Sequence, residues 1–379
     1  MNYSEKALKQ AKKFQGKIEV VSKVRVKTKD DLATVYTPGV AAVSLEIAKN
    51  LEKVWDLTIK QNTVAVVSDG SAVLGLGNIG PEAALPVMEG KCLLFRELGG
   101  VNAVPIVLKT QDVSEIVAIV KAIAPGFGGI NLEDISAPRC FEIEKKLQNI
   151  GIPVFHDDQW GTAIVVTAAL ENSLKVVGKK LSQVKIVIVG AGAAGIAIAK
   201  FLKPEKLIMF DSQGAIYKGR KNLNFAKVEV ANLPYYQQFK GDLPQALIGA
   251  DVFVGVSGSG KLESHWIAKM NKNPIIFALS NPNPEILPDK AKKAGAAVVA
   301  TGRSDFPNQV NNALVFPGFF AGMLKGKVRK VTEKMKRQAA KALSFQVKKP
   351  TSDKILPATL DKKVAQIIAQ SVTKVTNKQ

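Results

Sequence analysis

The chain has little cysteine, few acidic residues and no long apolar run, and each shortage excludes a class of protein. Its two cysteines, Cys92 and Cys140, are too few for a disulfide framework and too isolated for a zinc site, so we expect both to be small buried side chains. The uncharged run between Lys185 and Lys200 is too short to cross a bilayer. The N-terminus lacks the apolar core of a secretory signal. We therefore expect a cytoplasmic protein with no membrane partner.

The shortage of acid leaves a formal net charge of +21, from 53 basic and 32 acidic residues, with lysines crowded at both ends of the chain. A nucleic-acid-binding protein could have this composition. However, no aromatic residues alternate with the lysines, and no binding module is recognisable. We favour a solvated basic surface that weakly attracts anionic substrates, and we expect no nucleic-acid partner.

The length of 379 residues exceeds one ordinary core, and strands alternate with helical patterns from about residue 62 onward. This alternation predicts an α/β fold in two domains: an N-terminal α/β domain over 1–157 and a Rossmann-type dinucleotide-binding domain over 158–311. The basic helical segment 312–379 lies beyond the last strand, and we expect it to pack back on the first domain. At the front, the pattern predicts a helix over 4–20 and a loop from Asp31 to Val43, broken by Pro38 and Gly39.

A dinucleotide fingerprint begins at Lys185 with the residues KIVIVGAGAAGIAIAKFL. Gly190 permits the tight turn after the strand, Gly192 lets the backbone approach a diphosphate, and Gly195 allows close packing of helix and strand. Ala193 and Ala194 open the helix whose N-terminus faces that diphosphate. We expect all five residues to bind the cofactor.

Asp211 ends the next strand, about 20 residues after the first glycine, where an acid accepts hydrogen bonds from the ribose hydroxyls. An acid at this position repels a 2′-phosphate, so the sequence favours NAD over NADP. Lys218 and Arg220 are near enough in the sequence to weaken this preference.

The segment Gly255–Lys261 resembles a phosphate-binding P-loop, but Leu262 stands where a serine or threonine would hold Mg²⁺. The segment also follows a later strand of the domain already assigned to a dinucleotide. We exclude nucleoside triphosphate binding and expect this loop to line the cofactor cleft.

Two acidic pairs precede the fingerprint. Glu133 and Asp134 follow a strand, where ligands gather in open α/β sheets, and Asp157 and Asp158 precede a predicted helix that starts near Gly161. Clustered carboxylates suit a hard divalent cation, but one acid of each pair could equally cap a helix. From the residues alone, both interpretations stay open.

Seven segments in order carry a family resemblance: VYTPGVA, SDGSAVLGLGNIGPEAALPVMEGK, INLEDISAP, VFHDDQWGTA, the fingerprint, LSNPNPE and ATGRSDFPNQVNNALVFPG. Together they resemble the malic enzymes, particularly the short bacterial type, from about Asp31 to the C-terminus. The resemblance implies NAD-dependent oxidative decarboxylation of malate to pyruvate and CO₂ in a homodimer or larger homo-oligomer.

The resemblance also implies roles for individual residues. Glu133, Asp134 and Asp158 would bind Mg²⁺ or Mn²⁺, Lys91 would be the general base, and Tyr36 the general acid. Asp157 would contact the lysine. Asn281 and Asn312 would contact the substrate, and Asn281 would also border the cofactor.

The resemblance includes two departures and leaves alternatives open. Trp160 stands where relatives carry a smaller polar residue, so it could narrow the pocket and leave a catalytically impaired protein. The Ser71-Ala72-Val73 segment lacks a substrate-binding arginine found in larger relatives, and Arg139 is a candidate for its replacement. A malolactic reaction, which releases lactate and retains NAD, would use the same site.

Overall fold

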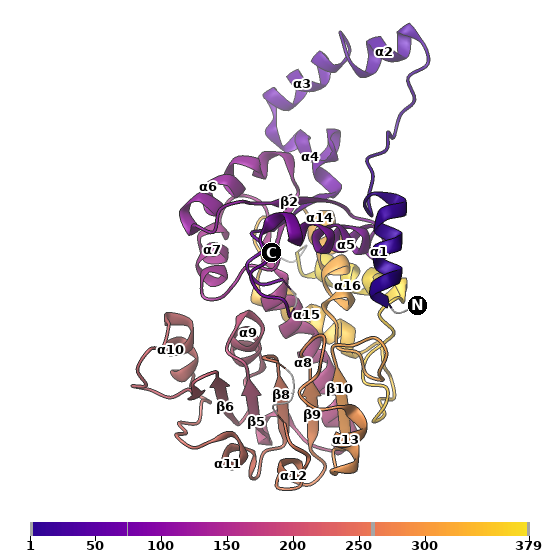
Figure 1. Cartoon of the computed structure of the whole chain (residues 1–379). Helices are drawn as coiled ribbons and strands as arrows, with labels where there is room; N and C mark the ends of the chain where they lie inside the picture. Colours follow the sequence, from indigo (N-terminus) through magenta and orange to yellow (C-terminus); the bar gives the residue numbers. More distant parts are fainter. Residues whose placement is uncertain (1–2, 74, 259–261, 377–379) are drawn as a thin grey trace.

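The computed structural model describes residues 3–73, 75–258 and 262–376 and shows two α/β domains connected by the long helix α8 (Asp157–Val177) (Figure 1). The first domain contains a parallel sheet with the strand order β2-β1-β3-β4. Its strands are β1 (Thr63–Ser68), β2 (Asn102–Val107), β3 (Gly129–Leu132) and β4 (Val154–His156). Its helices are α5 (Pro81–Gly99), α6 (Val113–Ile123) and α7 (Arg139–Leu147). The predicted α/β class is confirmed.

The second sheet has the order β10-β9-β8-β5-β6-β7 and is parallel except for β7, which pairs antiparallel with β6. Its strands are β5 (Lys185–Val189), β6 (Lys206–Asp211), β7 (Gly214–Ala215), β8 (Val252–Gly255), β9 (Ile275–Ala278) and β10 (Val298–Thr301). Its helices are α9 (Ala193–Leu202), α10 (Phe225–Ala231), α11 (Leu243–Leu247), α12 (Ser264–Ile267) and α13 (Pro288–Lys293). Strands β8, β9 and β10 are fully buried apolar runs, as expected for a parallel sheet covered on both faces.

The C-terminal helices return to the first domain, as the sequence predicts. They are α14 (Phe316–Lys325), α15 (Glu333–Ser344) and α16 (Lys362–Thr376). The ring of Phe316 lies 4.7 Å from that of Phe95 on α5, between centroids, and buries part of α14 against the first domain. Gly318 brings α16 close, because a Cβ there would lie 2.4 Å from the Ala365 carbonyl oxygen. α15 packs along α8 instead.

The N-terminal segment differs from the prediction. Helix α1 (Tyr3–Phe14) ends earlier than expected because Gln15 and Gly16 adopt positive φ angles of 52° and 131°. The predicted loop from Asp31 to Val43 is wrong: α2 (Lys29–Val35) and α3 (Val40–Lys49) occupy most of it. The break at Pro38 and Gly39 is only the turn between these two helices.

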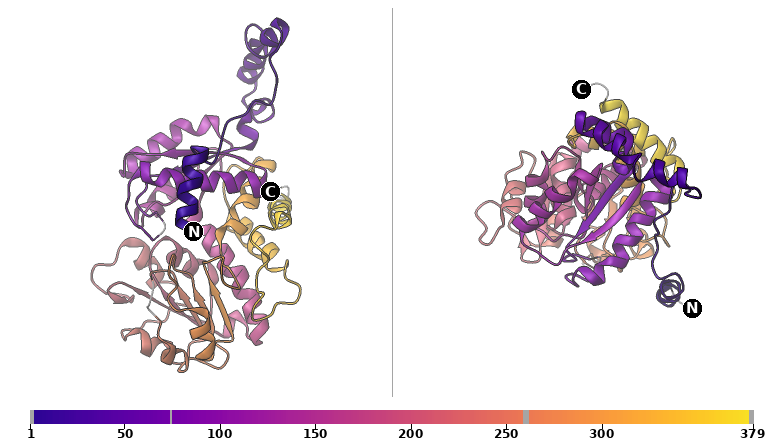
Figure 2. Two further views of the ribbon diagram at one scale, coloured as in Figure 1. Left: turned by 45° about the vertical axis from the view of Figure 1, so that its right-hand side comes forward. Right: turned by 90° about the horizontal axis from the view of Figure 1, so that it is seen from above.

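Helices α2 and α3 project away from both domains as an arm, which we define as residues 18–49 (Figures 1 and 2). No residue of α1, α2 or α3 is buried. After the arm, the short helix α4 (Val54–Leu57), flanked by 3₁₀ turns at Leu51–Lys53 and Ile59–Asn62, leads into β1. Further 3₁₀ turns lie at Ala124–Gly126, Leu181–Gln183 and Asn312–Leu314.

Two expectations from composition can be compared with the structure. Cys92 and Cys140 are both free and buried. Among the described residues, no helix combines the length and apolar character that crossing a membrane requires.

Candidate active site

The register of the first sheet brings the two acidic pairs together. Strands β3 and β4 are parallel neighbours, with Leu132 paired to His156, so the residues that follow each strand lie side by side at the same edge. Helix α8 starts at Asp157 rather than near Gly161, and therefore Asp157 and Asp158 lie in its first turn. Carboxylates there are favoured by the helix dipole.

Lys91, on the buried face of α5, points to these acids. Its Nζ donates to Glu133 Oε1 at 2.8 Å and to Asp157 Oδ2, and it lies 4.0 Å from the centre of the Phe316 ring. Burial by itself lowers the pKa of the Lys91 ammonium, but Asp157 and Glu133 outweigh burial and raise that pKa above its ordinary value.

Asp157 is fully buried and joins three parts of the chain. Its Oδ2 accepts from Lys91 and from Asn312 Nδ2, the latter at 2.5 Å. Gly161 leaves room for this carboxylate, because a Cβ there would lie 1.9 Å from Asp157 Oδ1. Burial is the main cause that raises the pKa of Asp157 to about 6. The structure therefore brings together Lys91, Asp157 and Asn312, which are 221 positions apart at the extremes (312 minus 91).

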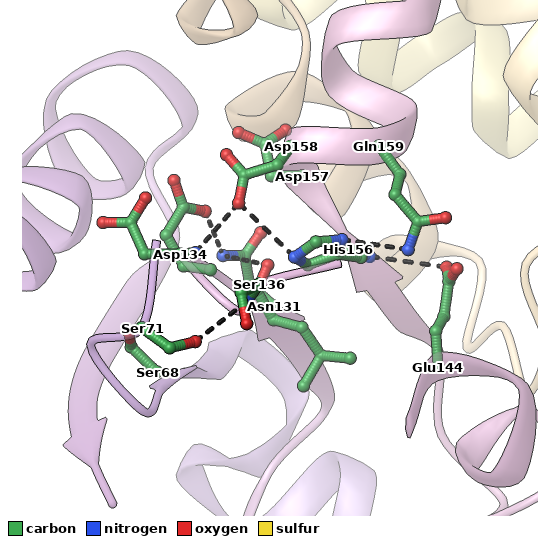
Figure 3. Close-up of polar contacts among 12 residues, drawn as sticks. Ser68, Ser71, Asn131, Asp134, Ser136, Glu144, His156, Asp157, Asp158 and Gln159 are labelled. Atoms are coloured by element: carbon green, nitrogen blue, oxygen red, sulfur yellow. Dashed lines mark hydrogen bonds and ion pairs between the residues drawn. The ribbon is translucent and has the colours of Figure 1, made fainter. Parts of the chain in front are cut away.

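Glu133, Asp134 and Asp158 each offer an oxygen within 4.8 Å of the others. The Asp134 backbone N–H donates to Asp158 Oδ2 at 2.9 Å, and Figure 3 shows Asp158 between Asp134 and His156. Burial, reinforced by the neighbouring carboxylates, raises the pKa of Glu133 to about 7 and that of Asp134 to about 9. Only Asp158 has a lowered pKa, because its contact with His156 outweighs burial.

These three carboxylates fit a divalent cation. Asp134 Oδ2 is buried with no hydrogen-bond partner among the described residues, and the raised pKa of this carboxyl means that its ionised form is unfavourable there. A bound cation would give this oxygen a partner and would offset the negative charge, and an all-oxygen donor set suits Mg²⁺ or Mn²⁺. Asp134 also adopts a φ of 53°, an uncommon conformation for a residue other than glycine. Their role as metal ligands stays a prediction.

Two buried residues that the sequence argument missed hold the acids in place. Asn131 Nδ2 donates to Glu133 Oε2 at 2.9 Å, and His156 Nε2 lies 3.4 Å from Asp158 Oδ2. Gln159 contacts the other ring nitrogen of His156 at 2.9 Å (Figure 3). A polar residue within an otherwise apolar strand was the available signal: Asn131 in INLED and His156 in VFHDD.

The fingerprint forms the expected turn between β5 and α9. Gly190 has a φ of 119°, and a Cβ on Gly195 would lie 1.9 Å from the Gly190 carbonyl oxygen, so neither position accepts a side chain. A Cβ on Gly192 would meet open space, and Ala193 and Ala194 form the first turn of α9. This arrangement leaves backbone N–H groups of the helix N-terminus available to a diphosphate.

A cavity of about 530 Å³ connects the fingerprint to the acidic cluster. Its walls include Ala194 on α9, Asp158 on α8, and Asn281 and Asn312. Ser257 and Gly258 also line it, as expected for the loop after β8, while Ser259, Gly260 and Lys261 lie outside the described residues. Asp158 thus belongs both to the acidic cluster and to the wall of the dinucleotide cleft.

Asp211 is more constrained than the sequence suggested. The Arg220 guanidinium donates to both carboxylate oxygens of Asp211, at 2.9 Å to Oδ1, and Lys227 Nζ donates to Oδ2 at 2.7 Å. Although burial opposes the shift, these contacts lower the pKa of Asp211 to about 2. Lys227 rather than Lys218 is the lysine that engages it, so the negative charge at the end of β6 is largely compensated.

Tyr36 is the one predicted catalytic residue that the structure does not bring to the site. It caps the end of α2 on the projecting arm and is 67% exposed. Figures 1 and 2 show the arm well away from α8, the helix that begins at Asp157. Within a single chain, Tyr36 and Lys91 do not meet.

The two departures noted in the sequence have structural explanations. Trp160 is not among the residues lining the cavity; its indole N–H donates to both oxygens of buried Glu144, at 2.8 and 3.0 Å. Its ring packs against Lys336, whose Nζ lies 3.1 Å from the ring centre. The expectation that Trp160 narrows the pocket is therefore wrong. Arg139 pairs with buried Asp69 at 2.9 Å, so it already has a partner.

Comparisons with known proteins give a consistent result over almost the whole chain. The profile described as "Malic enzyme, N-terminal domain" matches residues 15–148, and that described as "Malic enzyme, NAD binding domain" matches residues 160–377. The second match includes the C-terminal helices.

Individual relatives cover nearly the same span. The chain is 52% identical to the bifunctional malic/malolactic enzyme of Bacillus subtilis (strain 168), over 99% of this chain and 93% of that protein. It is 53% identical to the NAD-dependent malic enzyme of Geobacillus stearothermophilus, over 94% and 76% of the two chains. The crystal structure of the NAD-dependent malic enzyme of Thermotoga maritima is similar with a TM-score of 0.94 at 46% identity, covering 97% and 98% of the two chains.

Proposed function

The chain belongs to the malic enzyme family, and on this basis we propose that it oxidises malate to pyruvate and CO₂ while reducing NAD. The observation that carries the proposal is the position of Asp158, which is shared by the acidic cluster and the dinucleotide cleft. A substrate held at the cluster would have its C2 hydrogen close to a nicotinamide in the cleft. A hydride could then pass directly between them.

A divalent cation held by Glu133, Asp134 and Asp158 would polarise the 2-hydroxyl of malate and the carbonyl that replaces it. As a neutral amine, Lys91 would take the hydroxyl proton while the hydride leaves C2 for the nicotinamide. The ammonium form is favoured while Glu133 and Asp157 both accept from it. A cation bound to Glu133 would offset the negative charge of that carboxylate, which would lower the pKa of Lys91 and favour the neutral amine. Asp157 orients the amine, and Asn312 holds Asp157 by donating to the same carboxylate oxygen.

The oxidised product is a 2-oxo acid that loses its distal carboxylate as CO₂ and leaves an enolate. Protonation at C3 needs an acid, and we assign this role to Tyr36 of a second copy of the chain. The arm presents Leu32, Val35 and Val40 at 39–50% exposure in the same two helices that flank Tyr36. An apolar arm of this kind is expected to be covered in an assembly, so we propose a homodimer in which each arm completes the partner's site.

The proposal is tested by incubating the protein with malate, NAD and Mn²⁺ and measuring NADH, pyruvate and lactate. We expect NADH and pyruvate in equal amounts, and loss of both when EDTA is added. The Lys91→Ala variant should form neither, whereas Lys109→Ala, a change outside the site, should behave as the unaltered chain.

One alternative reaction has specific support, because the Bacillus subtilis relative is named a bifunctional malic/malolactic enzyme. Here the same site would return the hydride to pyruvate and release lactate. Lactate formed without free NADH in the same assay would favour this reaction over ours. The cytoplasmic location and the absence of a nucleic-acid partner, both expected from the sequence, stay predictions.

A further inference from the structure

A buried carboxylate, that of Glu285, contacts two of the loops that line the dinucleotide cleft. Glu285 is 1% exposed and follows the loop after β9. Its Oε1 accepts from the Ser280 hydroxyl and from the Ser257 backbone N–H at 3.4 Å, and its Oε2 accepts from the Ser280 backbone N–H at 3.2 Å. Both carboxylate oxygens are therefore acceptors, and the donors come from two different loops.

The same contacts extend to the wall of the cleft. The Gly258 backbone N–H donates to Ser280 Oγ at 2.7 Å, so the serine hydroxyl accepts from one loop while it donates to Glu285. Ser257, Gly258 and Ser280 all line the cavity, together with Asn281. Glu285 thus connects the loop after β8 to the loop after β9 through a single hydrogen-bonded chain.

The local backbone is shaped to admit this carboxylate. A Cβ on Gly255, the last residue of β8, would lie 2.3 Å from the Glu285 carboxyl carbon, so a side chain there would displace this carboxylate. Burial raises the pKa of the Glu285 carboxyl, and the hydrogen bonds from Ser280 and Ser257 oppose that change. Burying a carboxyl group costs free energy, and an apolar side chain could fill the same space without that cost. Packing alone therefore does not explain Glu285.

We propose that Glu285 is a positioning residue for the nicotinamide half of the cofactor: its carboxylate fixes the two loops that form that part of the cleft. The cavity that these loops line is also lined by Asp158 and Asn312. The hydride acceptor must lie next to a substrate held at Asp158, so the nicotinamide half of the cofactor would lie in this cavity. The proposal rests on the proposed function. It adds a residue that contacts neither the cofactor nor the substrate and acts through Ser257, Gly258 and Ser280.

The test compares Glu285→Gln with Ser280→Ala and with Glu263→Gln, a matched control whose carboxylate is 58% exposed on the neighbouring surface. Glutamine keeps the size of the side chain but presents an NH₂ group where one of the donors now points. NADH binding is followed by fluorescence without malate, Mn²⁺ binding by electron paramagnetic resonance, and the fold by thermal unfolding.

We expect Glu285→Gln and Ser280→Ala to weaken NADH binding and to raise the KM for NAD, each about tenfold, the effect of losing one hydrogen bond to a charged group. Mn²⁺ binding and the KM for malate should change less than twofold, and Glu263→Gln should match the unaltered chain. NADH binding within twofold of normal in a folded Glu285→Gln variant would overturn the proposal. Equal losses of NADH and Mn²⁺ binding would do so as well, because they indicate a general structural role.

If Glu285→Gln does not fold, the milder Ser280→Ala variant decides by the same criteria. The result stays distinct from a failure of the proposed function. An unaltered chain that binds NADH but does not oxidise malate ends the malate proposal, while the NADH comparison among variants still tests Glu285.

Discussion

Asp134→Asn is expected to stabilise the protein without a divalent cation and to abolish its stabilisation by one. Burial and the adjacent Asp158 and Glu133 raise the pKa of Asp134 to about 9, far above the ordinary 3.8. An acid whose pKa is raised by folding destabilises the folded state as pH rises from its ordinary pKa toward the raised one. Asparagine resembles the protonated acid and avoids this cost.

The magnitude follows from the same shift. One pKa unit corresponds to about 1.4 kcal/mol, and a buried carboxyl recovers part of its cost by local rearrangement, so we expect a gain of about 1–3 kcal/mol at pH 7 with EDTA present. The gain should shrink toward pH 5, because the pH is then closer to the ordinary pKa of 3.8 and less free energy is needed to protonate the carboxyl on folding. With Mn²⁺ at about one hundred times its Kd, the unaltered protein should instead gain about 2.7 kcal/mol.

Urea unfolding with EDTA or Mn²⁺, at pH 5, 7 and 8, measures both effects. Glu115→Gln, an exposed change on α6, serves as the control and should show neither. A variant Asp134→Asn that is less stable than the unaltered chain in EDTA at pH 7 would contradict the electrostatic argument. A variant that keeps the full Mn²⁺ stabilisation would remove Asp134 from the set of ligands.

Three further predictions concern other parts of the site. Mixing inactive Tyr36→Phe and Lys91→Ala chains should restore about a quarter of normal activity if dimers exchange at random. Half of the dimers are then mixed, and each mixed dimer has one intact site out of two. No recovery of activity would place Tyr36 in its own chain's site. Trp160→Phe should leave the KM for malate within twofold but destabilise the fold by about 1–3 kcal/mol, because Glu144 loses its indole donor; a large KM change would return the indole to the pocket. Arg220→Ala should raise the ratio of kcat/KM with NAD to that with NADP about tenfold, because it frees the negative charge at the end of β6; an unchanged ratio in parallel assays would count against it.

Local residues determined the fingerprint and most of the strands. The turn at Gly190 depends on a backbone conformation that glycine adopts freely, and Lys185–Val189 is apolar enough to specify a buried strand at the predicted bounds. The arm shows the limit of such reasoning. Pro38 and Gly39 were interpreted as a loop, although Thr28 and Asp31 form a capping box that marks the start of α2 and was visible in the sequence.

Some features of the site could be predicted from the sequence, and others depend on how the strands pair. The residues themselves offered carboxylates at 133–134 and 157–158 as candidates for either a cation or a helix cap, and the family resemblance chose among them. That Glu133 and Asp158 are neighbours depends on the parallel pairing of β3 with β4, which no short-range pattern specifies.

Only the tertiary structure determined which partner each buried charge has. Lys91 lies between Glu133 and Asp157, Asp211 is held by Arg220, and Glu285 connects two loops. The physical reason is that a buried charge requires a partner, but the sequence does not state which distant segment supplies it. The chain alone determined the chemistry available, and the packing of two sheets around α8 decided which groups meet.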